Sequence, residues 1–158
     1  MKRSILILLA LLCMTGCVDA KIPEVPANYS FTYENVEIVL HADAAPVISA
    51  LGEPKNYTEE ASCAFDGLDK TYHYGAFYLT TYPLEGRDYI YTLWFADDTV
   101  ATAEGIRIGS TQAQVEQAYG ADALNAAGNC VRIQGQSRLV ILLTDGLVSS
   151  VRYEAVLE

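Results

Sequence analysis

Histidine is scarce in this 158-residue chain, and the motifs of familiar catalytic sites are missing. His41 and His73 are the only two histidines, and no cysteine or carboxylate stands near them at the spacing of zinc ligands. The chain also lacks the Gly-x-Ser-x-Gly turn of serine hydrolases, a phosphate-binding glycine loop and a dinucleotide-binding fingerprint. We therefore predict no catalytic residue, no metal site and no cofactor, and we expect that the protein is not an enzyme.

Basic residues are also few, with ten Lys and Arg against twenty Asp and Glu, which gives a formal net charge of −10. Such a surface repels nucleic acid and anionic lipid headgroups, so we expect neither as a partner. Two interpretations of the acidic excess stay open. It suits cationic ligands, metal ions or basic protein surfaces, or it serves solubility alone.

Only one long apolar run occurs, from Ile5 to Leu12, and it is far shorter than the ~20 residues that a membrane-spanning helix needs. Lys2 and Arg3 precede this run, and small residues follow it. A positive head, a short apolar stretch and small residues are typical of an export signal. We therefore expect residues 1–16 to be removed, which leaves eight basic and twenty acidic residues in the mature chain.

The apolar run leads into Met14-Thr15-Gly16-Cys17, which resembles the lipobox of bacterial lipoproteins. The resemblance implies cleavage after Gly16, a diacylglycerol on Cys17, and a lipid anchor to the membrane on the extracytoplasmic face of the cell envelope. The alternative is an ordinary secretory signal with an incidental cysteine. We predict a lipidated N-terminus and flexible tether over residues 17–30, followed by a single domain over residues 31–158.

A weak internal repeat with an offset of 68 residues runs through the domain. Asp43 and Gly52 are suited to cap the two ends of one short helix. Thr111, with Gln114 as its reciprocal partner, and Gly120 are suited to cap another. We therefore predict two repeats, each opening with a short helix, over about residues 36–104 and 105–154.

Each predicted helix is followed by β-branched and aromatic residues that are broken by turn signals, such as Asp145-Gly146. The predicted strands cover residues 61–65, 71–82, 89–95, 99–103, 129–134, 137–143 and 147–153. We predict an α+β fold in which short helices pack on one face of an antiparallel sheet, arranged as two tandem helix-plus-β-meander repeats.

One segment carries a resemblance to a known fold. It runs Gly105-Ile106-Arg107-Ile108-Gly109-Ser110-Thr111 and continues with Val115, Tyr119 and Gly120. This segment resembles the opening of the β-lactamase-inhibitor-protein-like fold, which also occurs in the small lipoprotein subunit of the outer-membrane β-barrel assembly machine. The resemblance covers about residues 36–154 and implies a tandem repeat whose open sheet face binds a protein partner. No contact residue is carried over from the family.

Two cysteines of the predicted domain occupy nearly equivalent places in the two repeats. Cys63 and Cys130 lie 67 residues apart, each near the first predicted strand after a helix. An extracytoplasmic location permits a disulfide between them if their α-carbons come within about 7 Å. The alternative is two buried free thiols.

Tyrosine is abundant, with eleven residues. Tyr72, Tyr74, Tyr78 and Tyr82 share one parity, so they line a single sheet face if residues 71–82 form a regular strand without a bulge at Gly75. Exposed, these rings would make a contact surface for a protein or a glycan. The alternative is that they pack under the helices as core.

We expect the protein to be a membrane-anchored lipoprotein with a non-enzymatic protein-binding or envelope-accessory domain, such as a spacer or accessory subunit. The alternative is an envelope hydrolase, in which two carboxylates about 5–9 Å apart would carry acid–base chemistry.

Overall fold

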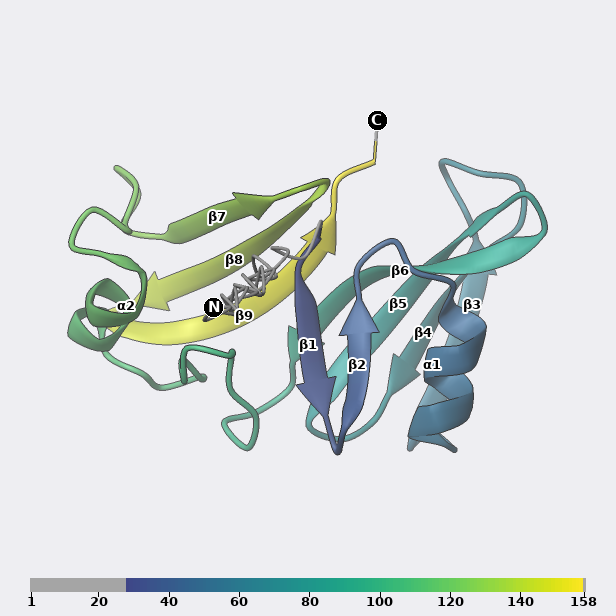
Figure 1. Ribbon diagram of the computed structural model, residues 1–158, viewed down its shortest axis with the longest axis horizontal. Helices are drawn as coiled ribbons and strands as arrows, with labels where there is room; N and C mark the ends of the chain where they lie inside the picture. The colour runs from purple at the N-terminus through teal and green to yellow at the C-terminus, as the bar shows by residue number, and fades with distance from the viewer. Residues whose placement is uncertain (1–27, 158) are drawn as a thin grey trace, which may run out of the picture.

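The computed structural model describes residues 28–157 and shows a mostly β structure with two short helices (Figure 1). Of the predicted elements, the lipobox with Gly16 and Cys17 lies outside the described residues. No helix in the described range is long and apolar enough to span a membrane. In chain order the elements are β1 (Ser30–Tyr33), β2 (Val36–Val39), α1 (Ala44–Leu51), β3 (Asn56–Ala61), β4 (Leu68–His73), β5 (Phe77–Leu84), β6 (Arg87–Phe95), α2 (Gln112–Tyr119), β7 (Cys130–Gln134), β8 (Ser137–Thr144) and β9 (Leu147–Ala155).

Seven of the strands form one antiparallel sheet in the order β3-β4-β5-β6-β9-β8-β7. Two runs of consecutive strands therefore meet at the centre, where Thr92 pairs with Glu154 and Trp94 pairs with Arg152. The turn between β8 and β9 is Asp145-Gly146, and both residues have positive φ, 52° and 76°. The predicted turn is confirmed, because these two residue types tolerate that conformation.

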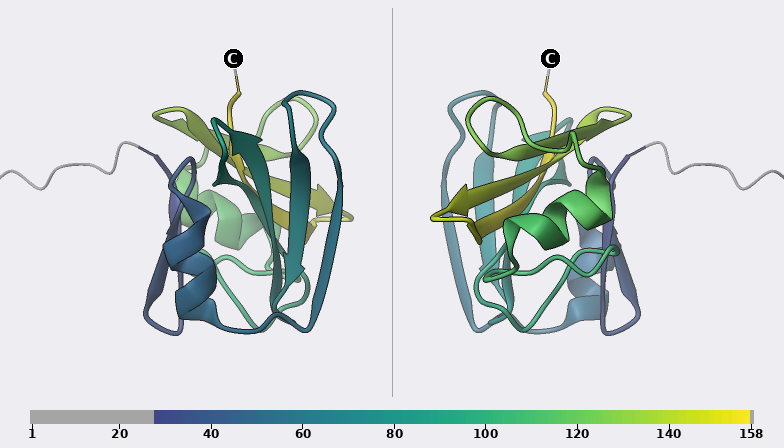
Figure 2. Two further views of the ribbon diagram at one scale, coloured as in Figure 1. Left: turned by 90° about the vertical axis from the view of Figure 1, so that its right-hand side faces the viewer. Right: turned by 90° about the vertical axis from the view of Figure 1, so that its left-hand side faces the viewer.

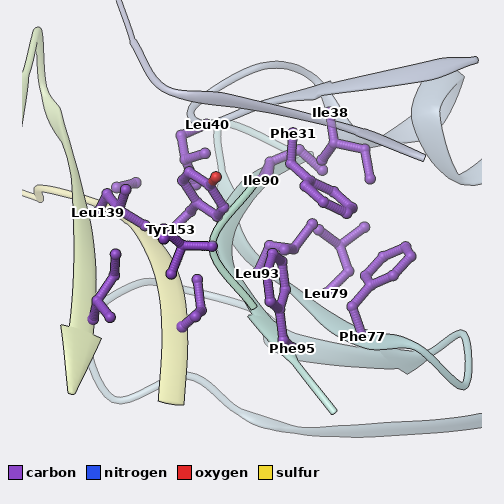
Figure 3. Close-up of a cluster of buried hydrophobic side chains, with 14 of the residues drawn as sticks. Phe31, Ile38, Leu40, Phe77, Leu79, Ile90, Leu93, Phe95, Leu139 and Tyr153 are labelled. Carbon is purple, nitrogen blue, oxygen red and sulfur yellow. The ribbon is translucent and has the colours of Figure 1, made fainter. Parts of the chain in front are cut away.

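A β1–β2 hairpin lies across one face of the sheet (Figure 2). Glu34 and Asn35 turn the chain with φ values of 47° and 67°. The hairpin buries Phe31, whose ring lies 5.6 Å from that of Phe77 and 5.3 Å from that of Phe95. Figure 3 shows these aromatic rings between the hairpin and the sheet, so the hairpin is the main cover of the core.

The predicted α+β class, with helices packed on one sheet face, is wrong, because the chain is mostly β and its second layer centres on the hairpin. The helices bury little, namely Ala44 and Val47 from α1 and Val115 from α2. The sequence predicted too large a role for the helices in covering the sheet. Their capping residues could be recognised in the sequence, whereas the β1–β2 hairpin that covers most of the core was not predicted.

Both predicted helix caps are confirmed. Asp43 accepts a hydrogen bond from the backbone N–H of Ala45 at 3.0 Å, and Gly52 ends α1 with φ of 74°. At α2 the side chains of Thr111 and Gln114 form a reciprocal capping box. Such caps satisfy backbone groups that a helix end would otherwise leave without partners.

The predicted strand over residues 71–82 is two strands. Gly75, with φ of 92°, lies in the turn between β4 and β5, and the register between β5 and β6 shifts again at Thr80 and Thr81. Residues 61–65 and 99–103 do not form the predicted strands either, since β3 ends at Ala61 and residues 99–103 lie in the connection from β6 to α2.

The disulfide between Cys63 and Cys130 does not form, since both thiols are free. Cys63 is exposed just after β3, whereas Cys130 is buried at the start of β7. These two strands are the opposite edges of the sheet, so equivalent positions in the two strand runs are far from each other. Burial raises the pKa of the Cys130 thiol, which disfavours its reactive thiolate form.

The folded domain begins before residue 31, its predicted start. Asn28 donates to the Leu40 carbonyl at 3.2 Å and accepts from the Gln136 backbone N–H at 2.8 Å. The Tyr29 backbone N–H donates to Ser137 Oγ at 2.6 Å. The chain therefore enters the domain against both the hairpin and the β7–β8 turn.

Candidate functional site

The face of the seven-stranded sheet that looks away from the hairpin, here called the open face, carries two rows of side chains that cross the strands. Side chains alternate between the two faces along each strand, so residues paired across strands share a face. The first row is His73, Tyr78, Trp94, Arg152, Val140 and Val131, from β4 to β7. The second row is Thr58, Thr71, Thr80, Thr92, Glu154, Arg138 and Ile133, from β3 to β7.

Three members of the first row, His73, Tyr78 and Trp94, stack in parallel and are named the aromatic row. The ring centroids of His73 and Tyr78 lie 4.2 Å apart at 9°, and those of Tyr78 and Trp94 lie 4.9 Å apart at 10°. Each ring limits the rotamers of the next, so the row is a rigid surface before any partner binds. Arg152 continues it on β9, opposite Trp94.

Threonines form the β3–β6 part of the second row, beside the aromatic row. The hydroxyls of Thr80 and Thr92 are 2.7 Å apart, and Thr80 Oγ1 also accepts from the backbone N–H of Thr92 at 3.2 Å. Thr58, on the edge strand β3, is exposed. This half of the open face thus combines aromatic ring edges with an ordered line of hydroxyl and methyl groups.

Glu154 holds two arginines on the other half of the open face. Its carboxylate accepts a hydrogen bond from the Nε–H group of Arg138 at one oxygen and forms an ion pair with Nε of Arg152 at the other. The Glu154 side chain is only 9% exposed, while the side chains of Arg138 and Arg152 are 50% and 46% exposed. The cluster has a net positive charge on a protein of net charge −10.

Exposed aliphatic side chains surround the two arginines. Ile133 is 75% exposed and Val131 is 40% exposed, both on the edge strand β7. Val140 lies between Val131 and Arg152 in the first row. Together with Arg138 and Arg152, these three residues are named the arginine patch.

Charged groups lie near both ends of the aromatic row. Near the His73 end, hydrogen bonds from the Thr99 hydroxyl and backbone N–H, together with the nearby Lys55 and His73, lower the pKa of the Asp97 carboxyl group. Lys55 thus balances the charge of Asp97, whereas Arg152 lies at the Trp94 end and is paired with Glu154.

The four tyrosines proposed as a binding face do not share a face. Tyr78 alone belongs to the aromatic row. Tyr72 pairs with the core residue Leu79, so it points to the other face, and Tyr74 lies between β4 and β5 and packs on Phe77. Tyr82 is 5% exposed and packs on Phe65.

No match is found. Comparisons with known protein families, with curated proteins and with solved structures all find nothing similar to this chain.

A cavity of about 510 Å³ beside α1 brings two carboxylates to one place, as the hydrolase alternative would require. Asp43 lies 3.6 Å from Arg87 Nη1 and also caps α1. Asp88 accepts from Lys70 Nζ at 2.7 Å, a bond that raises the pKa of Lys70. Each carboxylate has a cation as its partner, whereas a general acid needs surroundings that keep its carboxyl protonated. The cavity gives the hydrolase alternative no support.

Within residues 28–157, no three His, Cys, Asp or Glu side chains gather as metal ligands would. The residues that sequence reasoning missed are Trp94, Arg138 and Arg152. Trp94 lies between the apolar residues Leu93 and Phe95, and Arg152 between Val151 and Tyr153, so local alternation could have shown that these two side chains leave the core. Only the pairing of β6 with β9 brings Trp94 and Arg152 together, and nothing local in the sequence predicts that pairing.

Proposed function

We propose that this protein is a lipid-anchored, extracytoplasmic and non-enzymatic binding protein that holds a partner protein on the open face of its sheet. The observation that carries the proposal is the rigid stack of His73, Tyr78 and Trp94, which continues directly into Arg152. Tyr, Trp and Arg are the side chains most enriched at the energetic centres of protein interfaces. A stack that is already ordered also loses little side-chain entropy when it binds.

The lipobox at residues 14–17 supports the anchored part of the proposal. Eleven residues lead from Cys17 to Asn28, where the described domain begins, and an extended chain of that length reaches at most about 40 Å. The open face would thus work within a short distance of the membrane surface, against partners that are themselves embedded in it or close to it.

Replacing the lipidated residue tests the anchor. We expect Cys17→Ala to move the protein from the membrane fraction to the soluble fraction and to leave the mature N-terminus without an acyl mass, since dual acyl chains give stable membrane binding. Fractionation and intact-mass spectrometry measure both. Cys63→Ala is the matched control, because it removes an exposed thiol and should leave the protein on the membrane. An acyl mass that remains on the Cys17→Ala variant would contradict lipidation at Cys17.

Site-specific photo-crosslinking tests the binding face. With a photoreactive phenylalanine analogue at Tyr78, we expect a discrete protein adduct in native membranes, and we expect Trp94→Ser to reduce it at least about tenfold, because interface aromatics commonly contribute 2 kcal/mol or more. The same probe at Ala113, exposed on α2, is the control and should give no such adduct.

The crosslinked protein is then purified and titrated against the wild-type chain and the Trp94→Ser variant. Direct binding that the substitution weakens supports the proposal. An adduct that forms equally from Ala113, or one that Trp94→Ser leaves unchanged, would assign binding to another surface and overturn it.

A further inference from the structure

The arginine patch differs in charge and polarity from the rest of the surface. In the two rows Arg152 is flanked by Trp94 and Val140, and Arg138 by Glu154 and Ile133, so each guanidinium group has at least one apolar side chain beside it. Most of the remaining charge on this acidic chain is negative. At the arginine patch, the guanidinium groups therefore attract an anion, and the aliphatic side chains beside them offer apolar contacts.

The contacts with Glu154 orient the two guanidinium groups and leave most of their N–H donors available to a ligand. Each contact with Glu154 is made at Nε, which carries one of the five N–H donors of a guanidinium. Both arginine side chains remain about half exposed. Because the almost buried carboxylate fixes their planes, a ligand would pay less of the side-chain entropy that binding to a mobile arginine requires.

We propose that the arginine patch binds a segment of the partner protein that carries carboxylates next to aliphatic side chains. This inference rests on the proposed function and names the chemistry of its partner. A carboxylate matches the planar fork of a guanidinium and is held by two parallel hydrogen bonds. Aliphatic neighbours of that carboxylate would cover Val131, Ile133 and Val140, whose exposure to water is otherwise unfavourable.

The charges argue for a protein segment over a membrane surface. Attraction to anionic lipid is about 1 kcal/mol for each basic residue near the surface, and here one net positive charge stands against a chain of net charge −10. Stable electrostatic docking on lipid needs a cluster of several basic residues. One carboxylate of a protein partner, by contrast, is matched by the patch as it stands.

Trp94, the only tryptophan of the chain, gives a direct readout because it lies opposite Arg152. The mature lipidated chain in nonionic micelles is titrated with an octapeptide of alternating Val and Glu, and in parallel with one of alternating Val and Lys. We expect a saturable change of the Trp94 fluorescence with the Glu peptide, weakened by added salt, and none with the Lys peptide.

Three variants give the inference its direction. Arg152→Gln should weaken binding of the Glu peptide about tenfold, the loss typical for one charge-assisted contact. Arg107→Gln, which removes the same charge from an exposed loop residue, should leave it unchanged. Glu154→Gln should weaken binding several-fold while both arginines are kept, because a neutral amide has one acceptor oxygen and no longer fixes both guanidinium planes. Circular dichroism of each variant distinguishes a loss of binding from a loss of fold.

The inference is overturned by an equal response to both peptides, by no response to the Glu peptide, or by equal effects of Arg152→Gln and Arg107→Gln. Saturable binding to phosphatidylglycerol vesicles in place of the peptide would assign the patch to a lipid surface instead. None of these outcomes changes the adduct formed from Tyr78, so the failure of this inference is distinguishable from that of the proposed function.

Discussion

Phe31→Ala is expected to lower the free energy of unfolding by about 3–5 kcal/mol, the range for removing a buried phenylalanine ring. Phe31 is 5% exposed and contacts the rings of Phe77, Phe95 and Tyr153, with centroids 5.3–6.2 Å away. Alanine would leave a cavity between the hairpin and the sheet that neighbouring backbone is too constrained to fill. Urea denaturation followed by circular dichroism measures the loss.

The adjacent residue provides the matched control. Thr32 is on the same strand with its side chain exposed, so Thr32→Ala should change the free energy of unfolding by no more than about 0.5 kcal/mol. Val115→Ala tests the helical cover in the same way, because Val115 is the one residue that α2 buries. A larger loss from Val115→Ala than from Phe31→Ala would show that the hairpin is not the main cover of the core.

Tyr153→Phe is expected to flatten the fall in stability at alkaline pH. Burial, followed by the nearby charges of Glu104 and Tyr29, raises the pKa of Tyr153 above its usual value near 10. Above pH 10 the unfolded chain releases this proton while the folded chain retains it, so protons favour folding and stability falls as pH rises. The slope is about 1.4 kcal/mol for each pH unit and each such tyrosine.

Between pH 10 and pH 12 the variant should therefore gain about 2 kcal/mol relative to the wild type, because the unfolded tyrosine is only half ionised at pH 10, while the two differ little at pH 8. The ring packing against Phe31 and Tyr29 is kept in the variant. Urea denaturation at each pH measures the slopes. Tyr91→Phe, at a ring 36% exposed, is the control. Parallel slopes for the wild type and Tyr153→Phe between pH 10 and 12 would contradict the expectation.

The features that sequence predicts well here are those determined within a few residues. The capping box of Thr111 and Gln114 and the Asp145-Gly146 turn depend on local hydrogen bonds and on positive φ, and both are confirmed. The strands of the C-terminal half are predicted well because short turns separate segments in which buried and exposed side chains mostly alternate.

The errors come from features that depend on distant contacts or weak turn signals. Glu34-Asn35 turns the β1–β2 hairpin without a glycine, so its signal is poor, and the hairpin's role as cover depends on Phe31 meeting strands far along the chain. The prediction of a tyrosine face was wrong because the turn at Gly75 divides the segment into two strands. Side chains two residues apart share a sheet face only within one strand, so the rule does not apply across a turn.

The candidate site shows the same division. Tyr78 was singled out from the sequence, but its stacking partners on β4 and β6 and the continuation into Arg152 follow from strand pairing alone. The function inferred from the lipobox, by contrast, needs no tertiary contact, because the export and lipidation machinery reads a linear signal.

Asn28 has a mechanical consequence if the domain is held by its N-terminus, as proposed. Hydrogen bonds tie Asn28 and Tyr29 to Leu40 at the end of the hairpin and to Gln136 and Ser137 at the β7–β8 turn. A pulling force on the N-terminal segment would therefore load two distant parts of the fold at once, and β1 could not peel from β2 until these bonds had broken. If the anchor and a bound partner pulled on the domain in opposite directions, the hydrogen bonds of Asn28 and Tyr29 would therefore be the first to resist that force.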